Sequence, residues 1–241
     1  MDWNNDEKAD LLAGDTSGGI QVFLNNSATS RPQLSKGQYI YADSQLLNGG
    51  ERMTPDIADW NSDGKKDIIA GNMNGNLRVY LNEGSDESPL FKSFTHVRIK
   101  DRIFDLGSRS APRIFDWDGD GLQDILTGEM NGYIYYLKNT GTTASPEFQQ
   151  YGKLMLNNGE FLRYPDSSGN PRSRLYITDW NNDGLNDILT GGRTGEIILH
   201  LNSGKKDYSP SSVIRLIVNS LKERVLSTKL LMRRLVKAPE E

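Results

Sequence analysis

Short apolar runs framed by polar turns recur along most of this chain. Residues 124–128 (DILTG) form one such run, an NG turn follows, and residues 133–138 (YIYYLK) then alternate in polarity. Runs of this length, bounded by turn residues, predict β-strands. The second strand is expected to alternate between outward-facing and inward-facing positions, with Ile134, Tyr136 and Lys138 on one face and Tyr133, Tyr135 and Leu137 on the other.

The same pattern occurs four times without gaps, at residues 2–25, 59–82, 116–139 and 179–202. The starts lie 57, 57 and 63 residues apart, and a proline follows the closing asparagine of the first three copies by seven residues, at Pro32, Pro89 and Pro146. A further strand candidate follows, such as EFQQYGKLML at 147–156. A short strand (TPDIA, APRIF or RLYIT) then leads into the next copy. Such regular spacing indicates one structural unit used repeatedly.

Four short strands in about 57 residues match the size of a β-propeller blade. We therefore expect an all-β protein, with about four four-stranded blades over residues 1–210 in units starting near 2, 59, 116 and 179. Residues 211–241 are expected to add a last strand and a basic, amphipathic helical tail. Four blades can close a small ring, but the first unit has no strand before its loop. A piece of a larger propeller is therefore the favoured arrangement.

Composition and charge limit the classes of function. The 241 residues carry a net charge of −4, and they contain 24 glycines and no cysteine. The net negative charge argues against nucleic-acid binding. The lack of cysteine excludes disulfides and thiolate metal sites. The sequence contains no run of 18 apolar residues, so no membrane span is predicted. The opening MDWNNDEKAD has no signal-peptide pattern, so for an exported protein we expect a removed signal or an excerpt of a longer chain.

Each copy opens with an acidic loop that has the spacing of a cation site. In the third copy the oxygen ligands fall on Asp116, Asp118, Asp120, the carbonyl of Leu122, and Asp124, and Gly121 permits the sharp turn. This is the front half of an EF-hand loop. A full EF-hand needs Glu at position 12, where this chain has Ala70, Thr127 or Thr190, so an EF-hand is rejected.

Oxygen-only ligands in a flexible loop favour Ca²⁺ over zinc, copper or magnesium. Asp, Asn and Gly also form ordinary turns, which is the competing interpretation. About three calcium sites are predicted, at Asp59, Asn61, Asp63, Lys65 and Asp67; at Asp116, Asp118, Asp120, Leu122 and Asp124; and at Asp179, Asn181, Asp183, Leu185 and Asp187. A fourth, weaker site is predicted at Asp2, Asn4, Asp6, Lys8 and Asp10, because Glu7 replaces the loop glycine there.

The motifs DWDGDGLQDILTG and DWNNDGLNDILTG, followed by NxG and the proline, resemble the FG-GAP and VCBS repeats of integrin α-subunit propellers and many bacterial exported proteins. The resemblance covers residues 2–210. It implies a propeller whose calcium loops have a structural role, with ligands bound on other loops or between blades.

Aromatic and histidine residues complete the set of candidates. Trp3, Trp60, Trp117 and Trp180 all occupy loop position 2, where packing against a neighbouring blade is favoured over sugar stacking. Tyr39, Tyr41, Phe94 and Tyr151 are expected to lie in the core. His96 and His200 occupy different repeat positions, and neither lies in a recognisable nucleophile motif. Catalytic residues are therefore unknown, and no cofactor other than calcium is predicted.

The leading hypothesis is a non-catalytic, calcium-stabilised extracellular or cell-surface module that binds a glycan or a protein. Two alternatives remain: a polysaccharide lyase, or another carbohydrate-active enzyme domain, built on a calcium-binding propeller, and a structural spacer. Inter-blade loop variants that lose glycan binding without losing the fold would separate a binder from a spacer. The oligomeric state is left open.

Overall fold

The computed structural model describes residues 1–165, 169–202 and the backbone of the strand at 210–217. Within these residues the chain is all-β, with 19 strands in small antiparallel sheets. No helix in the described part of the chain is long and apolar enough to cross a membrane. The expected tail helix lies outside the described residues.

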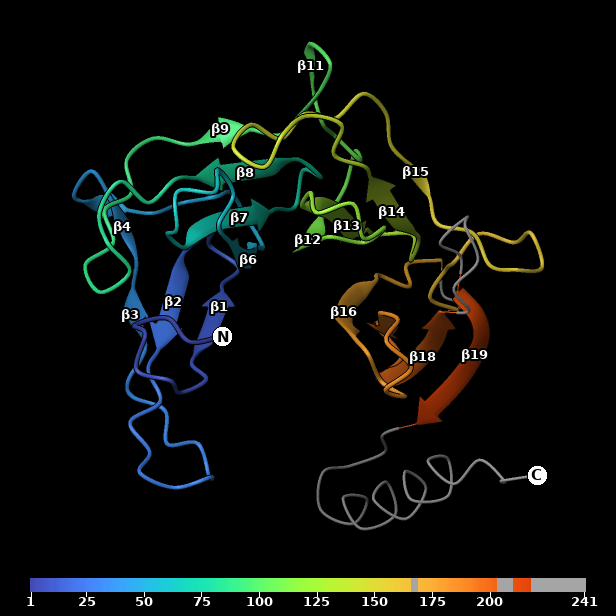
Figure 1. Cartoon of the computed structure of the whole chain (residues 1–241), viewed down its shortest axis with the longest axis horizontal. Helices are drawn as coiled ribbons and strands as arrows, with labels where there is room; N and C mark the ends of the chain where they lie inside the picture. The colour runs from blue at the N-terminus through green and yellow to red at the C-terminus, as the bar shows by residue number, and fades with distance from the viewer. Residues whose placement is uncertain (166–168, 203–209, 218–241) are drawn as a thin grey trace.

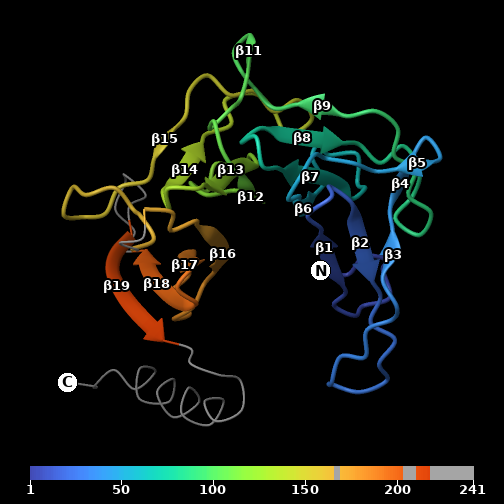
Figure 2. The same cartoon turned by 180° about the vertical axis from the view of Figure 1, so that it is seen from behind.

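Four sheets follow one another in chain order along an arch (Figures 1 and 2). The first sheet contains β1 (Leu11–Gly14), β2 (Ile20–Phe23) and β3 (Gln38–Tyr39). The second contains β6 (Thr54–Ala58), β7 (Asp67–Gly71), β8 (Leu77–Tyr80) and β9 (Thr95–His96). The third contains β12 (Ala111–Phe115), β13 (Asp124–Gly128), β14 (Ile134–Leu137) and β15 (Gly152–Lys153). The fourth contains β16 (Arg174–Thr178), β17 (Asp187–Gly191), β18 (Glu196–Asn202) and β19 (Pro210–Ile217).

Two short ribbons extend the outer strands. One pairs β4 (Tyr41–Ala42) with β5 (Gln45–Leu46), and the other pairs β10 (Arg98–Ile99) with β11 (Arg102–Ile103). Among the described residues, the first sheet has three strands, whereas each of the other three has four. The predicted strand at 147–156 is much shorter than expected, since only Gly152–Lys153 pairs with β14.

The hydrophobic core lies between the sheets. Three buried clusters join sheets one and two, two and three, and three and four. In β7, Ile68 packs in the first cluster while its neighbour Ile69 packs in the second, and both are fully buried. A sheet covered on both faces explains why DIIAG and DILTG are continuous apolar runs.

Burial on both faces corrects two expectations. The alternation at 133–138 does not mark a solvent face, because Ile134 and Leu137, on opposite faces, are both fully buried. The four outer aromatics expected in the core are exposed instead; Tyr39, Tyr41, Phe94 and Tyr151 keep 42%, 56%, 38% and 43% of their surface accessible. They lie in or beside two-residue outer strands, which no further sheet covers.

The inner strands of the sheets converge. β12 contacts both β6 and β16, and β1 contacts β6. Residues of β1, β6, β12 and β16 also line one common pocket of about 400 Å³. The acidic loops therefore lie at one end of the sheets, immediately after the innermost strands, in the segments that connect β6 to β7, β12 to β13 and β16 to β17.

Candidate functional site

All four acidic loops have the same hydrogen-bond geometry. In the third loop, Asp116 accepts hydrogen bonds from the amides of Asp120 (3.1 Å) and Gly121 (2.9 Å), and Asp120 accepts one from the amide of Leu122 (3.0 Å). The equivalent bonds recur around Asp2, Asp59 and Asp179. The carboxylates at positions 1 and 5 thus hold the turn, a role that the sequence pattern alone does not separate from metal binding.

The third loop brings three carboxylates together. Oxygens of Asp116, Asp118 and Asp120 lie within 4.8 Å of one another. The ammonium group of Lys138 bridges two of them, donating to Asp118 and to Asp120 (2.7 Å). This hydrogen bond is the main reason that the pKa of Asp120 lies below its usual value. Lys138 thus already supplies one positive charge to the triad, whose all-oxygen donor set is of the kind that Ca²⁺ binds.

The second and fourth loops carry an amide in place of the middle carboxylate. Asn61 donates to Asp63 (3.3 Å), and Asn181 donates to Asp183 (2.8 Å). An asparagine side-chain oxygen can also coordinate calcium. These loops bring two carboxylates and one amide together, and their predicted ligand sets remain predictions.

Position 7 was predicted to supply a backbone carbonyl. The structure shows that its amide donates to the carboxylate at position 5 in each loop, at Lys8, Lys65, Leu122 and Leu185. The Lys8 and Lys65 side chains also lie 3.4 and 3.6 Å from Asp6 and Asp63. These half-exposed ion pairs add little to stability.

The aspartate at position 9 is a buried anchor between the loop and the sheet. Asp124 is fully buried, and its oxygens accept hydrogen bonds from the amides of Trp117 (3.2 Å) and Asn139 (2.7 Å) and from the Tyr136 hydroxyl (2.9 Å). The equivalent amide bonds occur at Asp10, Asp67 and Asp187. Burial raises the pKa of Asp67 and Asp124 to about 6, against the opposing effect of these bonds.

The first loop folds like the others although Glu7 replaces the glycine. Glu7 has φ +66°, and the glycines at this position have φ +84°. A side chain in this left-handed region costs about 1–2 kcal/mol. This backbone strain is a cost of the first loop that is separate from its predicted weak metal binding, which stays a prediction.

We expect Glu7→Gly to stabilise the chain by about 1 kcal/mol, because it removes this strain. The matched control is Gly64→Ala, where nothing lies within 4 Å of an added Cβ, so that only backbone strain opposes it. Chemical denaturation in a chelator should give opposite signs for the two variants. Equal signs would contradict the strain argument.

Two of the loop tryptophans join one repeat to the next. Trp3 packs against Phe91 and Trp60 against Phe148, with ring centroids 6.4 and 6.1 Å apart. Trp117 is buried in the cluster between sheets three and four. The favoured prediction of packing is confirmed for Trp3 and Trp117, which are buried, and Trp60 packs on Phe148 while its side chain stays half-buried. The first three acidic loops are thereby coupled to the following units.

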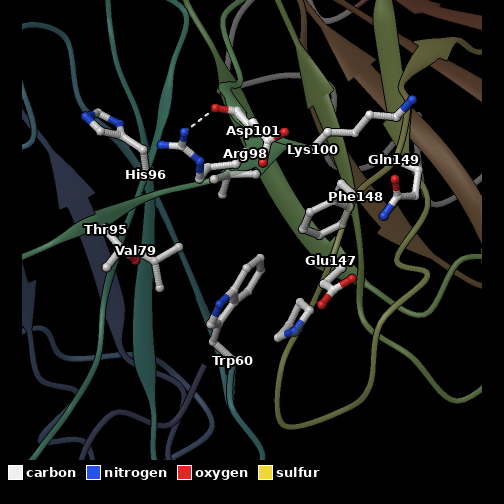
Figure 3. A pocket seen from close by; sticks show the side chains of 12 residues that line it. Trp60, Val79, Thr95, His96, Arg98, Lys100, Asp101, Glu147, Phe148 and Gln149 are labelled. Carbon is white, nitrogen blue, oxygen red and sulfur yellow. Dashed lines mark hydrogen bonds between the residues drawn. The ribbon is translucent and has the colours of Figure 1, made fainter.

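One cleft lies between the second and third units. It has a volume of about 650 Å³ and is lined by Trp60, Val79, Thr95, His96, Val97, Arg98, Lys100, Asp101, Pro146, Glu147, Phe148 and Gln149. Figure 3 shows the Trp60 ring between Val79 on one wall and Phe148 with Glu147 on the other. The Lys100 amide donates to the Phe148 carbonyl (2.9 Å), which ties the two walls together. Only the loop tryptophan pointed to this cleft in the sequence.

Comparison with solved structures finds distant likenesses. An Agrocybe aegerita lectin, described by its specific recognition of non-reducing terminal N-acetylglucosamine, matches with a TM-score of 0.48 and 21% identity, over 92% of this chain and 52% of the lectin. The Photorhabdus luminescens Tc holotoxin pore matches with a TM-score of 0.42 and 15% identity, over 90% of this chain and 10% of the toxin chain. This chain thus spans about half the length of the lectin. No curated protein matches its sequence.

The family comparison is more decisive. The model of the FG-GAP-like repeat matches residues 2–70 and 59–127, which together span more than half of the chain. Each match begins at an acidic loop and runs to the strand after the next loop, so it follows the unit that the structure repeats. The chain therefore belongs to the FG-GAP-like repeat family, whose repeats form propeller blades.

Proposed function

We propose that this chain is a calcium-stabilised propeller module of an exported protein, which binds a saccharide between two blades and performs no catalysis. The observation that carries the proposal is the cleft between the second and third units. Its volume of about 650 Å³ lies within the usual range for ligand sites, roughly 300–1,000 Å³. The arch of four sheets favours a piece of a larger propeller over a closed four-bladed ring.

The lining of the cleft suits a sugar. The half-buried Trp60 ring offers an apolar face, and Arg98, Lys100, Glu147 and Gln149 offer donors and acceptors for hydroxyl groups. Aromatic faces with a few surrounding polar groups are typical of small-ligand sites. All four polar residues are exposed, so Lys100 and Gln149 can be changed without loss of core packing.

Calcium is linked to this cleft through the second acidic loop. Trp60 directly follows Asp59, the first predicted ligand, and its amide donates to Asp67 (2.9 Å). A cation held by Asp59, Asn61, Asp63, the carbonyl of Lys65, and Asp67 would fix the backbone that carries the indole. Neutralising the clustered carboxylates is the contribution that the ion makes here. Saccharide binding should therefore require calcium.

The test is binding of the whole chain to a panel of neutral and acidic oligosaccharides, including N-acetylglucosamine, in calcium and in EDTA. We expect calcium-dependent binding that Gln149→Ala and Lys100→Ala weaken about tenfold, while Lys36→Ala, an exposed lysine outside the cleft, leaves it unchanged. Saccharide binding that the cleft variants do not weaken would overturn the assignment of the site. Absence of any saccharide binding would leave a protein ligand or a spacer role.

The same incubations test the alternative of a polysaccharide lyase. A lyase leaves unsaturated sugar ends that absorb ultraviolet light, and its rate rises with pH as its catalytic base loses a proton. We expect binding without such products. Formation of unsaturated ends by the wild-type chain, lost in a cleft variant, would contradict the non-catalytic proposal.

A further inference from the structure

Arginine recurs at one position of the repeat outside the acidic loops. Arg52, Arg109 and Arg172 each lie seven residues before the aspartate that opens the next loop. All three have positive φ, +57°, +40° and +55°. Their amides donate to the carbonyls of Thr16 (3.2 Å), Met73 (2.8 Å) and Met130 (2.9 Å), which occupy equivalent turns of the preceding unit. The repeat therefore fixes these backbones at the junctions between units.

The last two units bring four arginines to one pocket. This arginine pocket has a volume of about 450 Å³ and is lined by Arg109, Arg172, Arg174, Gly191, Gly192, Arg193, Gly195, Glu196 and Ile197. Arg193 occupies the turn position that Thr16, Met73 and Met130 hold in the other units, and its amide donates to the Pro171 carbonyl (2.9 Å).

The four guanidinium groups form no ion pair within the described residues. Arg109 is only 6% exposed, and the buried Nε atoms of Arg109 and Arg172 have no hydrogen-bond acceptor. Arg174 donates to the neighbouring Ser173 carbonyl (3.1 Å), and among the described residues no carboxylate forms an ion pair with Arg109, Arg172, Arg174 or Arg193. An unpaired charge of this kind is costly once buried.

The arginines also repel one another. Burial and the nearby charges of Arg109, Arg113 and Arg172 lower the pKa of Arg174 to about 10. Burial, followed by the charges of Arg172 and Arg52, lowers the pKa of Arg109. Four guanidinium groups against the one carboxylate of Glu196 give the described pocket a positive charge, although residues 1–207 as a whole are acidic, with 21 basic and 29 acidic side chains.

We propose that the arginine pocket is a second binding site, which takes an oxyanion such as a carboxylate, sulfate or phosphate group of a ligand. Guanidinium groups match such groups with paired, charge-assisted hydrogen bonds. An anion would give Arg109 Nε and Arg172 Nε acceptors and would remove the repulsion between the four side chains. The site is independent of the saccharide cleft, because no residue lines both.

The experiment titrates the calcium-loaded full chain with sulfate and, separately, with malonate, at constant ionic strength balanced by sodium chloride. Titration calorimetry should show saturable binding, and the preference between the tetrahedral anion and the dicarboxylate identifies the chemical class. We expect Arg172→Gln and the exposed Arg193→Gln to weaken binding about tenfold each. Arg102→Gln, an exposed arginine on β11 outside the pocket, should leave binding unchanged.

Stability without the anion gives a second readout. If the arginine pocket is an anion-binding site, Arg172→Gln and Arg193→Gln should be at least as stable as the wild type in chloride alone, because each substitution removes a repelling charge. They should also lose the stabilisation that sulfate or malonate provides. No saturable binding of either anion, or binding that both variants retain, would overturn the proposal. Destabilisation in chloride with no anion dependence would show that the arginines have partners within the protein, which also overturns it.

Discussion

Asp124→Ala is expected to destabilise the chain by about 2–5 kcal/mol, one of the largest effects of any single substitution in an acidic loop. The carboxylate of Asp124 accepts the amides of Trp117 and Asn139, which are fifteen or more residues apart along the chain. Without this carboxylate, two buried amide donors lose their acceptor, and each loss costs about 1–3 kcal/mol of stability. The Tyr136 hydroxyl loses a partner as well.

Urea unfolding in EDTA measures this effect apart from any metal. Asp120→Ala is the matched control, since the exposed Asp120 accepts a single backbone amide, and it should cost much less. Asp124→Asn should fall between the two, because its amide oxygen keeps one acceptor. A free energy of unfolding for Asp124→Ala within about 0.5 kcal/mol of the wild type would contradict the role of position 9 as the buried anchor.

The fourth sheet is expected to lose stability as the pH falls from about 6.5 to about 4. His200 is 2% exposed in β18; its Nε2 lies 3.0 Å from the Thr190 hydroxyl, and its buried Nδ1 has no partner. Burial lowers the pKa of His200 from 6.5 to about 4. The unfolded chain therefore takes up a proton in this range while the folded chain does not. The stability contributed by neutral His200 is complete above pH 6.5 and is lost as the pH falls, by about 3 kcal/mol.

His200→Leu separates this effect from the titration of the carboxylates. Leu137 occupies the same repeat position in β14 and pairs with Ile125, as His200 pairs with the equivalent Ile188. The repeat therefore shows that leucine fits this environment. We expect the difference in unfolding free energy between His200→Leu and the wild type to grow in favour of the variant as the pH is lowered from 7 to about 4.5. A difference that does not change with pH would contradict the buried neutral histidine.

The repeat made the inner strands predictable. The strand at 124–128 and the short strands TPDIA, APRIF and RLYIT occur with the predicted bounds, because a continuous apolar run between turns has few other folds available. The family assignment follows from the same residues. Tyr39 and Tyr151 were misplaced in the core, since sequence periodicity does not show which strand lies at the outer edge of a sheet.

The candidate sites were only partly predictable. The sequence marks the acidic positions. It does not show that the Asn139 amide donates to Asp124, because this contact depends on where β14 ends. Arg109 and Arg172 are visible in register along the chain, yet their convergence with Arg174 and Arg193 arises only when the last two units pack together. Spacing within one loop can be predicted from a sequence, whereas contacts between units need the fold.

Calcium binding by the acidic loops is tested most directly by thermal unfolding. The purified chain is melted in excess EDTA, then in millimolar calcium, with magnesium at the same concentration as the control. A site at 100-fold excess of calcium over its dissociation constant adds about 2.7 kcal/mol, or several degrees in Tm for a domain of this size. We expect a rise of several degrees with calcium and not with magnesium. An identical Tm in all three conditions would show that the loops are only turns, and would contradict the account.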